Sequence, residues 1–422
     1  MQKINKFVHS QSFISLVIQL SGFALSFVLS IVLTNLFDAN IYGDYVLIYS
    51  TIDMFAILSL MGYNQLFSIE VPKIKTDEER FGLFIIARRK SLLNSFIISV
   101  GLLIFGFFYF FNEKNLSYLI ISSSLILPFL GLTVVNTNFL YSLRESILPQ
   151  LNDKIFRIIF FILFLLIFYS FSNSIIVVVL AFLISSFITF LISRYLRKKK
   201  ISYNRDAVQV VEKKINKTIY LLIVINVINL LFSKTDAFQL AYFLGADHAG
   251  VNNIYMKMSH VINLVMSSSL LIFSPKISKV IAQQRFDLVR RELKKVFRFA
   301  LPVSLVMLTF VLIFTPFLLQ IYASNLYLSH WYSVPLYCLS AILGILIGPA
   351  AMVLMLSNKL KALIIGFIFE LLLNFLLNAT LIPYFSIEGA AIATVISELA
   401  VNLYFSLVCY HYFRLNTSFF GK

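Results

Sequence analysis

Hydrophobic residues come in long continuous runs along this chain. Residues 155–171 (IFRIIFFILFLLIFYSF) and 175–193 (IIVVVLAFLISSFITFLIS) have no polar face to show to water. About 20 such residues cross a hydrocarbon core of roughly 30 Å, because a helix rises 1.5 Å per residue. The pattern therefore predicts an all-α polytopic membrane protein. In order, the apolar runs predict twelve transmembrane helices, near 12–36, 45–69, 91–111, 116–140, 155–171, 174–194, 219–244, 254–273, 299–320, 331–356, 362–381 and 390–413.

The basic residues support this order of crossings. Short cytoplasmic loops collect Lys and Arg. With the N-terminus inside, only Lys114 falls in an outer connection, while Lys234 and Lys257 fall within spans. All other lysines and arginines lie on the inner side, which predicts that both termini are cytoplasmic.

Composition narrows the class of protein further. The chain is 59% hydrophobic and 13% charged, with a formal net charge of +16, whereas a soluble protein has about 25% charged residues. The topology and an attraction to membrane lipids explain the excess of positive charge, so no nucleic-acid partner is predicted. The two cysteines, five histidines and fourteen glycines form no metal-ligand or phosphate-cradling motif. No metal and no cofactor are predicted.

The sequence also repeats. Residues 36–48 (LFDANIYGDYVLI) are echoed by 244–256 (LGADHAGVNNIYM), and 71–75 (VPKIK) by 274–278 (SPKIS). Repeats are common in secondary transporters. With six spans in each half, they predict a parallel pair of lobes about an axis along the membrane normal. The predicted parts are an N-terminal lobe at 1–200, a basic cytoplasmic linker at 201–217 and a C-terminal lobe at 218–422.

These motifs, with FSPKIS (273–278) and above all LIPYFSIEGAAIATVISE (381–398), resemble a known family. They are similar to the Wzx-type polysaccharide flippases of the multidrug/oligosaccharidyl-lipid/polysaccharide (MOP, MATE-like) exporter superfamily. The resemblance implies two six-helix lobes around a central cavity that opens alternately to either side. It implies a non-enzymatic flippase that moves undecaprenyl-pyrophosphate-linked oligosaccharide repeat units from the inner to the outer leaflet of the bacterial cytoplasmic membrane. The products would be surface polysaccharides such as O-antigen or capsule, with polysaccharide polymerase machinery as a partner.

The glycines and small residues of these motifs have a structural interpretation. Close helix packing in lipid depends on small side chains, so EGAAIAT (388–394) predicts a tight helix contact. Gly43 and Gly250, at equivalent places in the two repeats, are expected in tight outer turns.

Cations inside the spans are the first functional candidates. A charge at the centre of a transmembrane helix costs roughly 2.5–3.5 kcal/mol, so it is expected to face a protein interior or a wet cavity. Lys234 and Lys257 are predicted to bind the phosphates of the moving headgroup, with Arg157 and Arg88 at the inner mouth. For Lys257 an equal alternative is that the side chain snorkels to the outer headgroups.

Acidic and amide side chains form a second set. A polar residue every third or fourth position places such residues on one helix face. One stripe comprises Glu370, Asn374 and Asn378, and another comprises Asn226, Asn229, Ser233 and Asp236; Asp53 and Glu398 lie in two further spans. These groups are predicted to bind a coupling H⁺ or Na⁺ or to hold the lysines charged. The alternative is polar contact between helices without a role in transport.

Two alternatives to a flippase differ in how far the sequence supports them. The spans hold four buried acids and only two lysines, and this excess of negative charge disfavours an anion site. An ion-coupled multidrug or small-molecule antiporter of the same superfamily is therefore an alternative function. A membrane enzyme acting on lipid-linked sugars is disfavoured, because the predicted outer connections are too short for the long outer loop that such chemistry would use.

Overall fold

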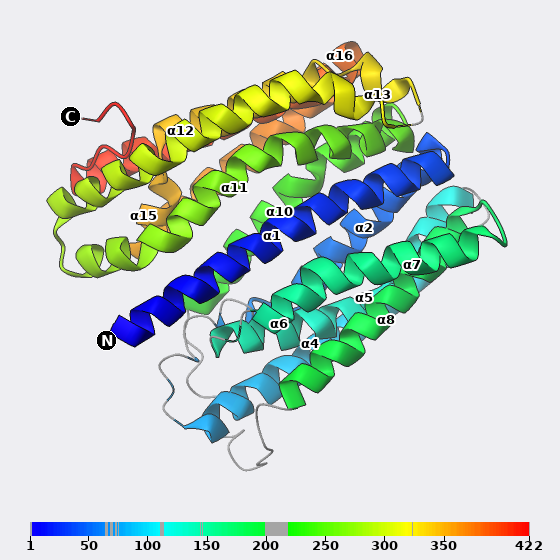
Figure 1. Ribbon diagram of the computed structural model, residues 1–422, viewed down its shortest axis with the longest axis horizontal. Coiled ribbons are helices and arrows are strands. Elements are labelled where there is room, and N and C mark those ends of the chain that lie inside the picture. The colour runs from blue at the N-terminus through cyan, green and yellow to red at the C-terminus, as the bar shows by residue number, and fades with distance from the viewer. Residues whose placement is uncertain are drawn as a thin grey trace. The chain divides into compact units, whose positions relative to one another are not determined.

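The chain divides into two compact units, Met1–Ile223 and Val224–Lys422. The computed structural model describes residues 2–63, 66–67, 71, 74, 76–109, 114–143, 145, 147–198, 218–322 and 324–421. Throughout these ranges the regular structure is helical, with no β-strand among them (Figure 1). The predicted linker at 201–217 lies outside the described residues, so the division into lobes at 1–200 and 218–422 stays a prediction.

Unit 1 is organised around the helix α5. In the most apolar segment of α5, 72% of the residues are buried, against 22% in the corresponding segment of α4. The helices α2, α4 and α8 all pack against α5, so its apolar surface is covered by protein rather than exposed. The elements of the unit are α1 (Gln2–Leu36), α2 (Ala39–Ser59), α4 (Asp77–Tyr109), α5 (Lys114–Ser142), α6 (Ile147–Gln150), the π-helical turn η1 (Leu151–Phe156), α7 (Arg157–Tyr169) and α8 (Ile175–Lys198).

Unit 2 is a second helical assembly. The long helix α11 packs against α12 and α14, and both α14 and α15 pack against α16. The pair α14 and α15 is bent by 51° where Gly348 adopts a φ of 90°. The elements are the part of α10 (Thr218–Phe243) from Val224 onward, α11 (Ala246–Ala282), α12 (Phe286–Leu319), α13 (Leu326–Ser329), α14 (Ser333–Ile347), α15 (Ala350–Leu356) and α16 (Leu360–Phe413).

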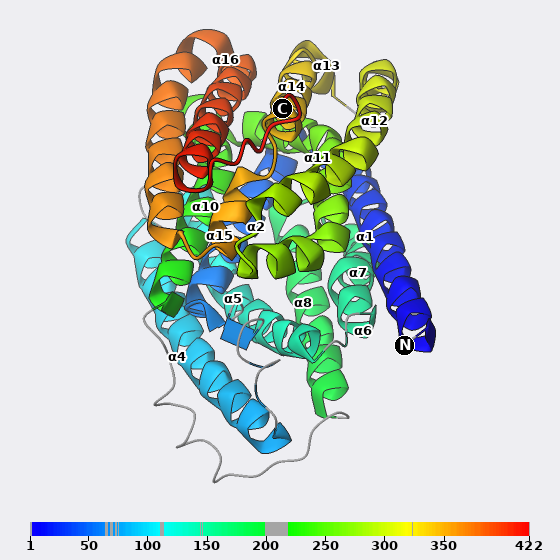
Figure 2. The same ribbon diagram turned by 90° about the vertical axis from the view of Figure 1, so that its left-hand side faces the viewer.

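The helix α16 folds back on itself at Ser386. This residue has non-helical angles, φ 55° and ψ −134°, within an otherwise helical stretch of 54 residues. Figure 2 shows the two arms, orange and red, side by side, and the hydrogen bond from Asn374 to Thr394 joins them. The arms cover two of the predicted spans, 362–381 and 390–413. The fold-back brings the polar stripe of the first arm against the start of the second.

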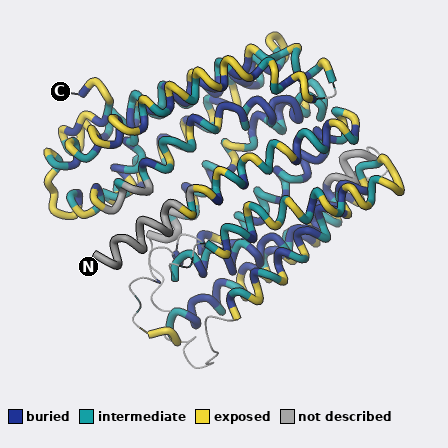
Figure 3. The backbone as a smooth tube through the Cα atoms, in the orientation of Figure 1, coloured by how far each residue is buried: buried dark blue, intermediate teal, exposed yellow. Residues whose placement is uncertain are grey.

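The protein crosses a membrane several times. Exposed positions occur along most of the helices (yellow in Figure 3). Large apolar side chains are among them, including Leu93, Phe96 and Phe317, each more than half exposed. Among the described residues, seven helices are long and apolar enough to span, or eight if α14 and α15 count as one bent span. Twelve crossings remain a prediction, because α7, α10 and α11 do not meet this criterion individually. The seven helices are Val17–Leu36, Ala39–Ser59, Asp77–Phe107, Ile120–Ser142, Ile175–Lys198, Phe286–Leu319 and Leu360–Phe413.

The expectation that Gly43 and Gly250 occupy tight turns is wrong. Both lie inside helices, Gly43 in α2 and Gly250 in α11. The turn before α11 is made at Gly245, whose φ of 114° lies in a region that L side chains rarely adopt. The repeated motif therefore marks the start of a helix in each unit.

Close packing of the small residues after Ser386 is confirmed. Gly389 and Ala390 are buried, and a Cβ atom on Gly389 would lie 2.5 Å from the carbonyl oxygen of Leu381 in the first arm. No side chain fits there without separating the two arms. In contrast, a Cβ atom on Gly101 would meet nothing within 4 Å.

We therefore expect Gly389→Ala to destabilise the protein and Gly101→Ala to leave it unchanged or slightly more stable. Overpacking costs about 1–3 kcal/mol, whereas alanine in an open helical position is favoured over glycine by up to about 1 kcal/mol. The measurement is the melting temperature of each purified variant in detergent. Equal melting temperatures for the two variants would contradict the tight contact between the arms of α16.

Candidate functional site

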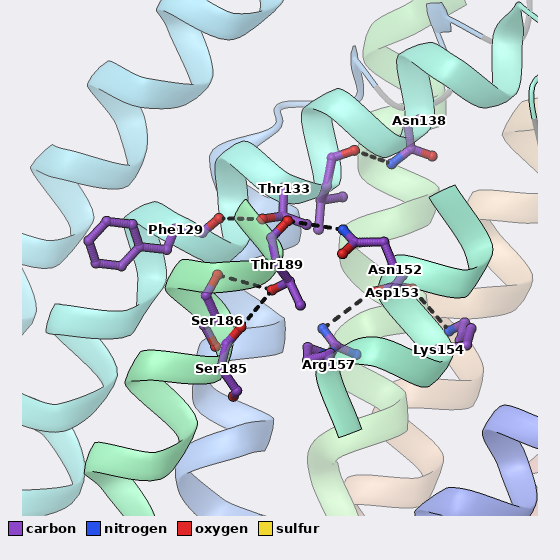
Figure 4. A network of polar contacts seen from close by, with 11 residues as sticks. Phe129, Thr133, Asn138, Asn152, Asp153, Lys154, Arg157, Ser185, Ser186 and Thr189 are labelled. Carbon is purple, nitrogen blue, oxygen red and sulfur yellow. Dashed lines mark hydrogen bonds and ion pairs between the residues drawn. The ribbon is translucent and has the colours of Figure 1, made fainter. Parts of the chain in front are cut away.

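A π-helical turn in unit 1 carries the first group of charged residues. Asp153 lies within η1, and Arg157 is the first residue of α7. A carboxylate oxygen of Asp153 lies 3.3 Å from Nη1 of Arg157, and its other oxygen lies 3.4 Å from Nζ of Lys154 (Figure 4). The Asp153 and Arg157 side chains are only 20% and 18% exposed, whereas that of Lys154 is 50% exposed. The Asp153–Arg157 pair is thus the inner part of the group.

Hydrogen bonds and close packing hold this turn in place. The fully buried Asn152 donates from Nδ2 to the carbonyl oxygen of Thr189 in α8, at 3.0 Å (Figure 4). On the other side, a Cβ atom on Gly22 of α1 would lie 2.7 Å from Cβ of Lys154, so α1 closely approaches η1. The turn is clamped between α1 and α8, which fixes where Arg157 points. Single π turns within helices frequently occur at functional sites.

Helix α2 adds a phenol and a carboxylate to the same group. Arg157 interacts electrostatically with Tyr49 and Asp53 as well as with Asp153. The structure therefore brings together two of the predicted residues, Asp53 and Arg157. It also adds Asp153 and Tyr49, which the sequence analysis missed. The spacing of four between Asp153 and Arg157 was the available signal, since such residues are neighbours on a helix.

In unit 2 a cluster of hydrogen bonds surrounds Asp236. Its Oδ1 accepts from Nδ2 of Asn378 at 2.7 Å, and its Oδ2 accepts from Oγ1 of Thr394 at 2.8 Å. The same Nδ2 of Asn378 also lies 3.1 Å from Oδ1 of Asn374. All four side chains are buried. The structure thus joins three predicted residues, Asp236, Asn374 and Asn378, and adds Thr394, which lies within the motif at 381–398.

The chemistry of the Asp236 cluster suits a small hard cation or a proton. Carboxylate, amide and hydroxyl oxygens are the ligands that hard cations prefer. Oδ1 of Asn378 is buried without a hydrogen-bond partner among the described residues. A buried carboxylate held only by neutral donors retains a net negative charge, which a cation or proton would neutralise.

Two further predicted acids line a cavity in unit 2. Glu370 and Glu398 face a cavity of about 290 Å³ together with Ser340, Asn263 and Asn402. The hydroxyl of Ser340 donates to Oε2 of Glu398. The two acids also interact electrostatically with each other. This cavity is therefore polar and acidic along one wall.

The predicted lysines lie elsewhere in unit 2. Lys234 of α10 and Lys257 of α11 are both half-buried, and both lie within electrostatic range of His260. The hydrogen bonds of Asp236 go to Asn378 and Thr394 rather than to Lys234. Asn226 and Asn229 are half-buried on α10 and join none of the hydrogen bonds of the Asp236 cluster. Arg88 lies in a separate pocket of unit 1, between α4 and α8.

The fold is shared with transporters of the MOP superfamily. An inward-facing MATE multidrug resistance transporter superposes with a TM-score of 0.71, covering 96% of this chain and 98% of its own, at 11% identity. A MOP superfamily transporter from Pyrococcus furiosus, described by the reverse polarity of its binding pocket, has a TM-score of 0.67, with 96% and 94% covered at 14% identity. The lipid II flippase MurJ in an inward closed conformation also reaches 0.67, with 93% and 86% covered at 13% identity.

These likenesses define the class of fold, that of the MOP superfamily. The sequence itself gives the family: residues 8–281 match the model of the polysaccharide biosynthesis protein family, and the chain belongs to that family. No curated protein matches the chain. The resemblance drawn from the motifs is thereby confirmed.

Proposed function

We propose that the protein is a flippase for undecaprenyl-pyrophosphate-linked oligosaccharide repeat units. It would move them from the inner to the outer leaflet of the bacterial cytoplasmic membrane, with both of its termini in the cytoplasm. The two units would act as lobes of an alternating-access transporter with twelve crossings. The product would be a surface polysaccharide such as O-antigen or capsule, and a polysaccharide polymerase would take over the flipped unit.

The observation that carries this proposal is the largely buried guanidinium of Arg157 on its π turn, which is held between α1 and α8. A pyrophosphate group crossing the membrane needs cations along its path, and arginine presents planar fork donors that match phosphate oxygens. Asp153 orients the guanidinium, which is always charged, before substrate arrives. The family match to polysaccharide biosynthesis proteins supports a substrate that belongs to polysaccharide synthesis.

The energy for the cycle would come from H⁺ or Na⁺ bound at the Asp236 cluster. An ion can bias a two-state transporter only by binding one state more tightly than the other. The buried carboxylate of Asp236 provides that difference if its hydrogen bonds to Asn378 and Thr394 rearrange between states. Glu370 and Glu398 would be second candidates, in the neighbouring cavity.

An ion-coupled multidrug antiporter is the second candidate function. The acids of unit 2, Asp236, Glu370 and Glu398, favour it, because an acidic cavity wall attracts cationic drugs. The deciding experiment compares drug-cation efflux in an efflux-deficient strain with complementation of surface-glycan synthesis in a flippase-deficient strain. Complementation without efflux supports the flippase, and efflux without complementation supports the antiporter.

We expect Lys234 to distinguish an anion-binding role from a structural one. If its ammonium holds the substrate phosphate, Lys234→Arg keeps most of the complementation because the charge is retained, while Lys234→Gln loses most of it at normal membrane abundance. The measurements are complementation and immunoblotted membrane levels. Asn229→Asp, on the same helix, is the control, because it adds a charge instead of removing one. It should not show the combination expected of Lys234→Gln, which is normal membrane abundance with most of the complementation lost. A Lys234→Gln variant that is abundant and fully complementing contradicts this role.

A further inference from the structure

A pocket in unit 1 combines apolar walls with four cations. It has a volume of about 730 Å³ and lies between the start of α4 and the end of α8. The cationic lining comes from Arg88 and Arg89 on α4 and from Arg197 and Lys198 on α8. The apolar lining consists of Phe81, Phe84, Ile85, Leu92 and Leu93. No acidic side chain belongs to the described part of the lining.

Arg197 is the most deeply buried of the four cations in this pocket. Its guanidinium lies over the ring of Phe84, 5.0 Å from the ring centroid. The residue is only 7% exposed, and its Nε has no hydrogen-bond partner among the described residues. The nearest acids on α4 lie in its first turn, where Asp77 pairs with Arg80 at 2.9 Å. A buried guanidinium without an acidic partner is costly unless an anion accompanies it.

The surroundings place the pocket at a membrane–water boundary. On α4 the basic residues 88–90 are followed by an apolar stretch, and on α8 an apolar stretch is followed by Arg194, Arg197 and Lys198. From the pocket, exposed apolar side chains continue along α4 from Leu92 to Phe107. Fifteen residues of helix cover about 22 Å, which exceeds the roughly 15 Å of one hydrocarbon leaflet. An acyl chain therefore has an apolar track that starts at the cations.

We propose that this pocket binds the phosphate headgroup of an anionic glycerophospholipid, whose acyl chains follow the exposed side of α4. The headgroup phosphate accepts hydrogen bonds from Arg197 and Arg88, while Arg89 and Lys198 contribute to the positive field. Basic pockets between transmembrane helices on the cytoplasmic side suit such lipids. The inference is independent of the transported substrate. It assigns Arg88 to lipid binding rather than to the substrate path.

The test uses purified full-length protein, native mass spectrometry and melting temperatures measured with phosphatidylglycerol. We expect bound phosphatidylglycerol on the parental protein and a roughly 30-fold weaker affinity for Arg88→Gln/Arg197→Gln, because each basic residue contributes about 1 kcal/mol. Arg88→Lys/Arg197→Lys should keep most of the binding. The control, Arg291→Gln/Lys294→Gln on α12, removes the same charge from exposed positions and should bind like the parent. If the first pair fails to fold, Arg89→Gln/Lys198→Gln replaces it.

Three results would overturn the proposal. One is equal phosphatidylglycerol binding by the pocket and control variants. Another is equal binding of phosphatidylcholine, which carries no net charge. The third is that undecaprenyl phosphate or inorganic phosphate competes fully at the same concentration as phosphatidylglycerol. Full competition by undecaprenyl phosphate would assign the pocket to the polyprenyl carrier, and full competition by inorganic phosphate would show that phosphate alone suffices.

Discussion

Replacement of Arg157 by Gln is expected to lower both membrane abundance and transport. The Asp153–Arg157 pair is about four-fifths buried, and removing one partner of a buried pair typically costs about 3–5 kcal/mol because the other charge is stranded. Lys154→Gln is the matched control, since it removes the other cation bonded to Asp153, at a side chain that is half exposed. Exposed pairs contribute only about 0–1 kcal/mol, so the control should remain near the parental level.

The double variant Asp153→Asn/Arg157→Gln separates stability from transport. Without the stranded carboxylate, abundance should return to near the parental level. If Arg157 binds the pyrophosphate, transport by the double variant should stay at least tenfold below the parent. Immunoblotted membrane levels and complementation of surface-glycan synthesis measure the two quantities. Full transport by an abundant double variant would show that the pair serves only the fold.

The second large effect is expected at Asp236. Asp236→Asn keeps the shape of the side chain and an oxygen that can accept from Asn378, and the hydroxyl of Thr394 can turn to accept from the new amide. The variant should therefore be as abundant as the parent, while transport falls at least tenfold because the charge that binds the coupling ion is lost. Asp287→Asn, at a side chain 63% exposed on α12, is the control and should transport normally.

The ion dependence of that defect identifies its cause. Transport by the parent in proteoliposomes should respond to an imposed Na⁺ or H⁺ gradient, and the residual transport by Asp236→Asn should respond to neither. Asp236→Ala should differ by also losing abundance, because the buried hydroxyl of Thr394 and one N–H of Asn378 would lose their acceptor, and an unsatisfied buried polar group costs about 1–3 kcal/mol. A gradient response unchanged in Asp236→Asn would place the coupling ion elsewhere, with Glu370 and Glu398 next to be tested.

Some of the candidate site could be predicted because helical spacing is local. Glu370, Asn374 and Asn378 follow one another at four-residue intervals, and all three are buried on one face of α16. What spacing could not supply was the partner on another helix. Thr394 bonds Asp236 across 158 positions of sequence, and only the fold-back at Ser386 brings it there.

The sequence by itself determined the class of protein. Long apolar runs must lie in a hydrocarbon environment, so a multi-pass helical membrane protein followed from the pattern, and the motifs were sufficient for the family. The ends of helices could be predicted less well from the sequence, because a break such as the one at Ser386 depends on the packing of the arms that it joins. The tertiary structure alone decided which polar groups meet across helices: Arg157 with Asp53, Asp236 with Asn378 and Thr394, and Arg88 with Arg197. The physical reason is that a buried charge is stabilised by whatever lies around it in space, and helix packing sets those neighbours across long distances in sequence.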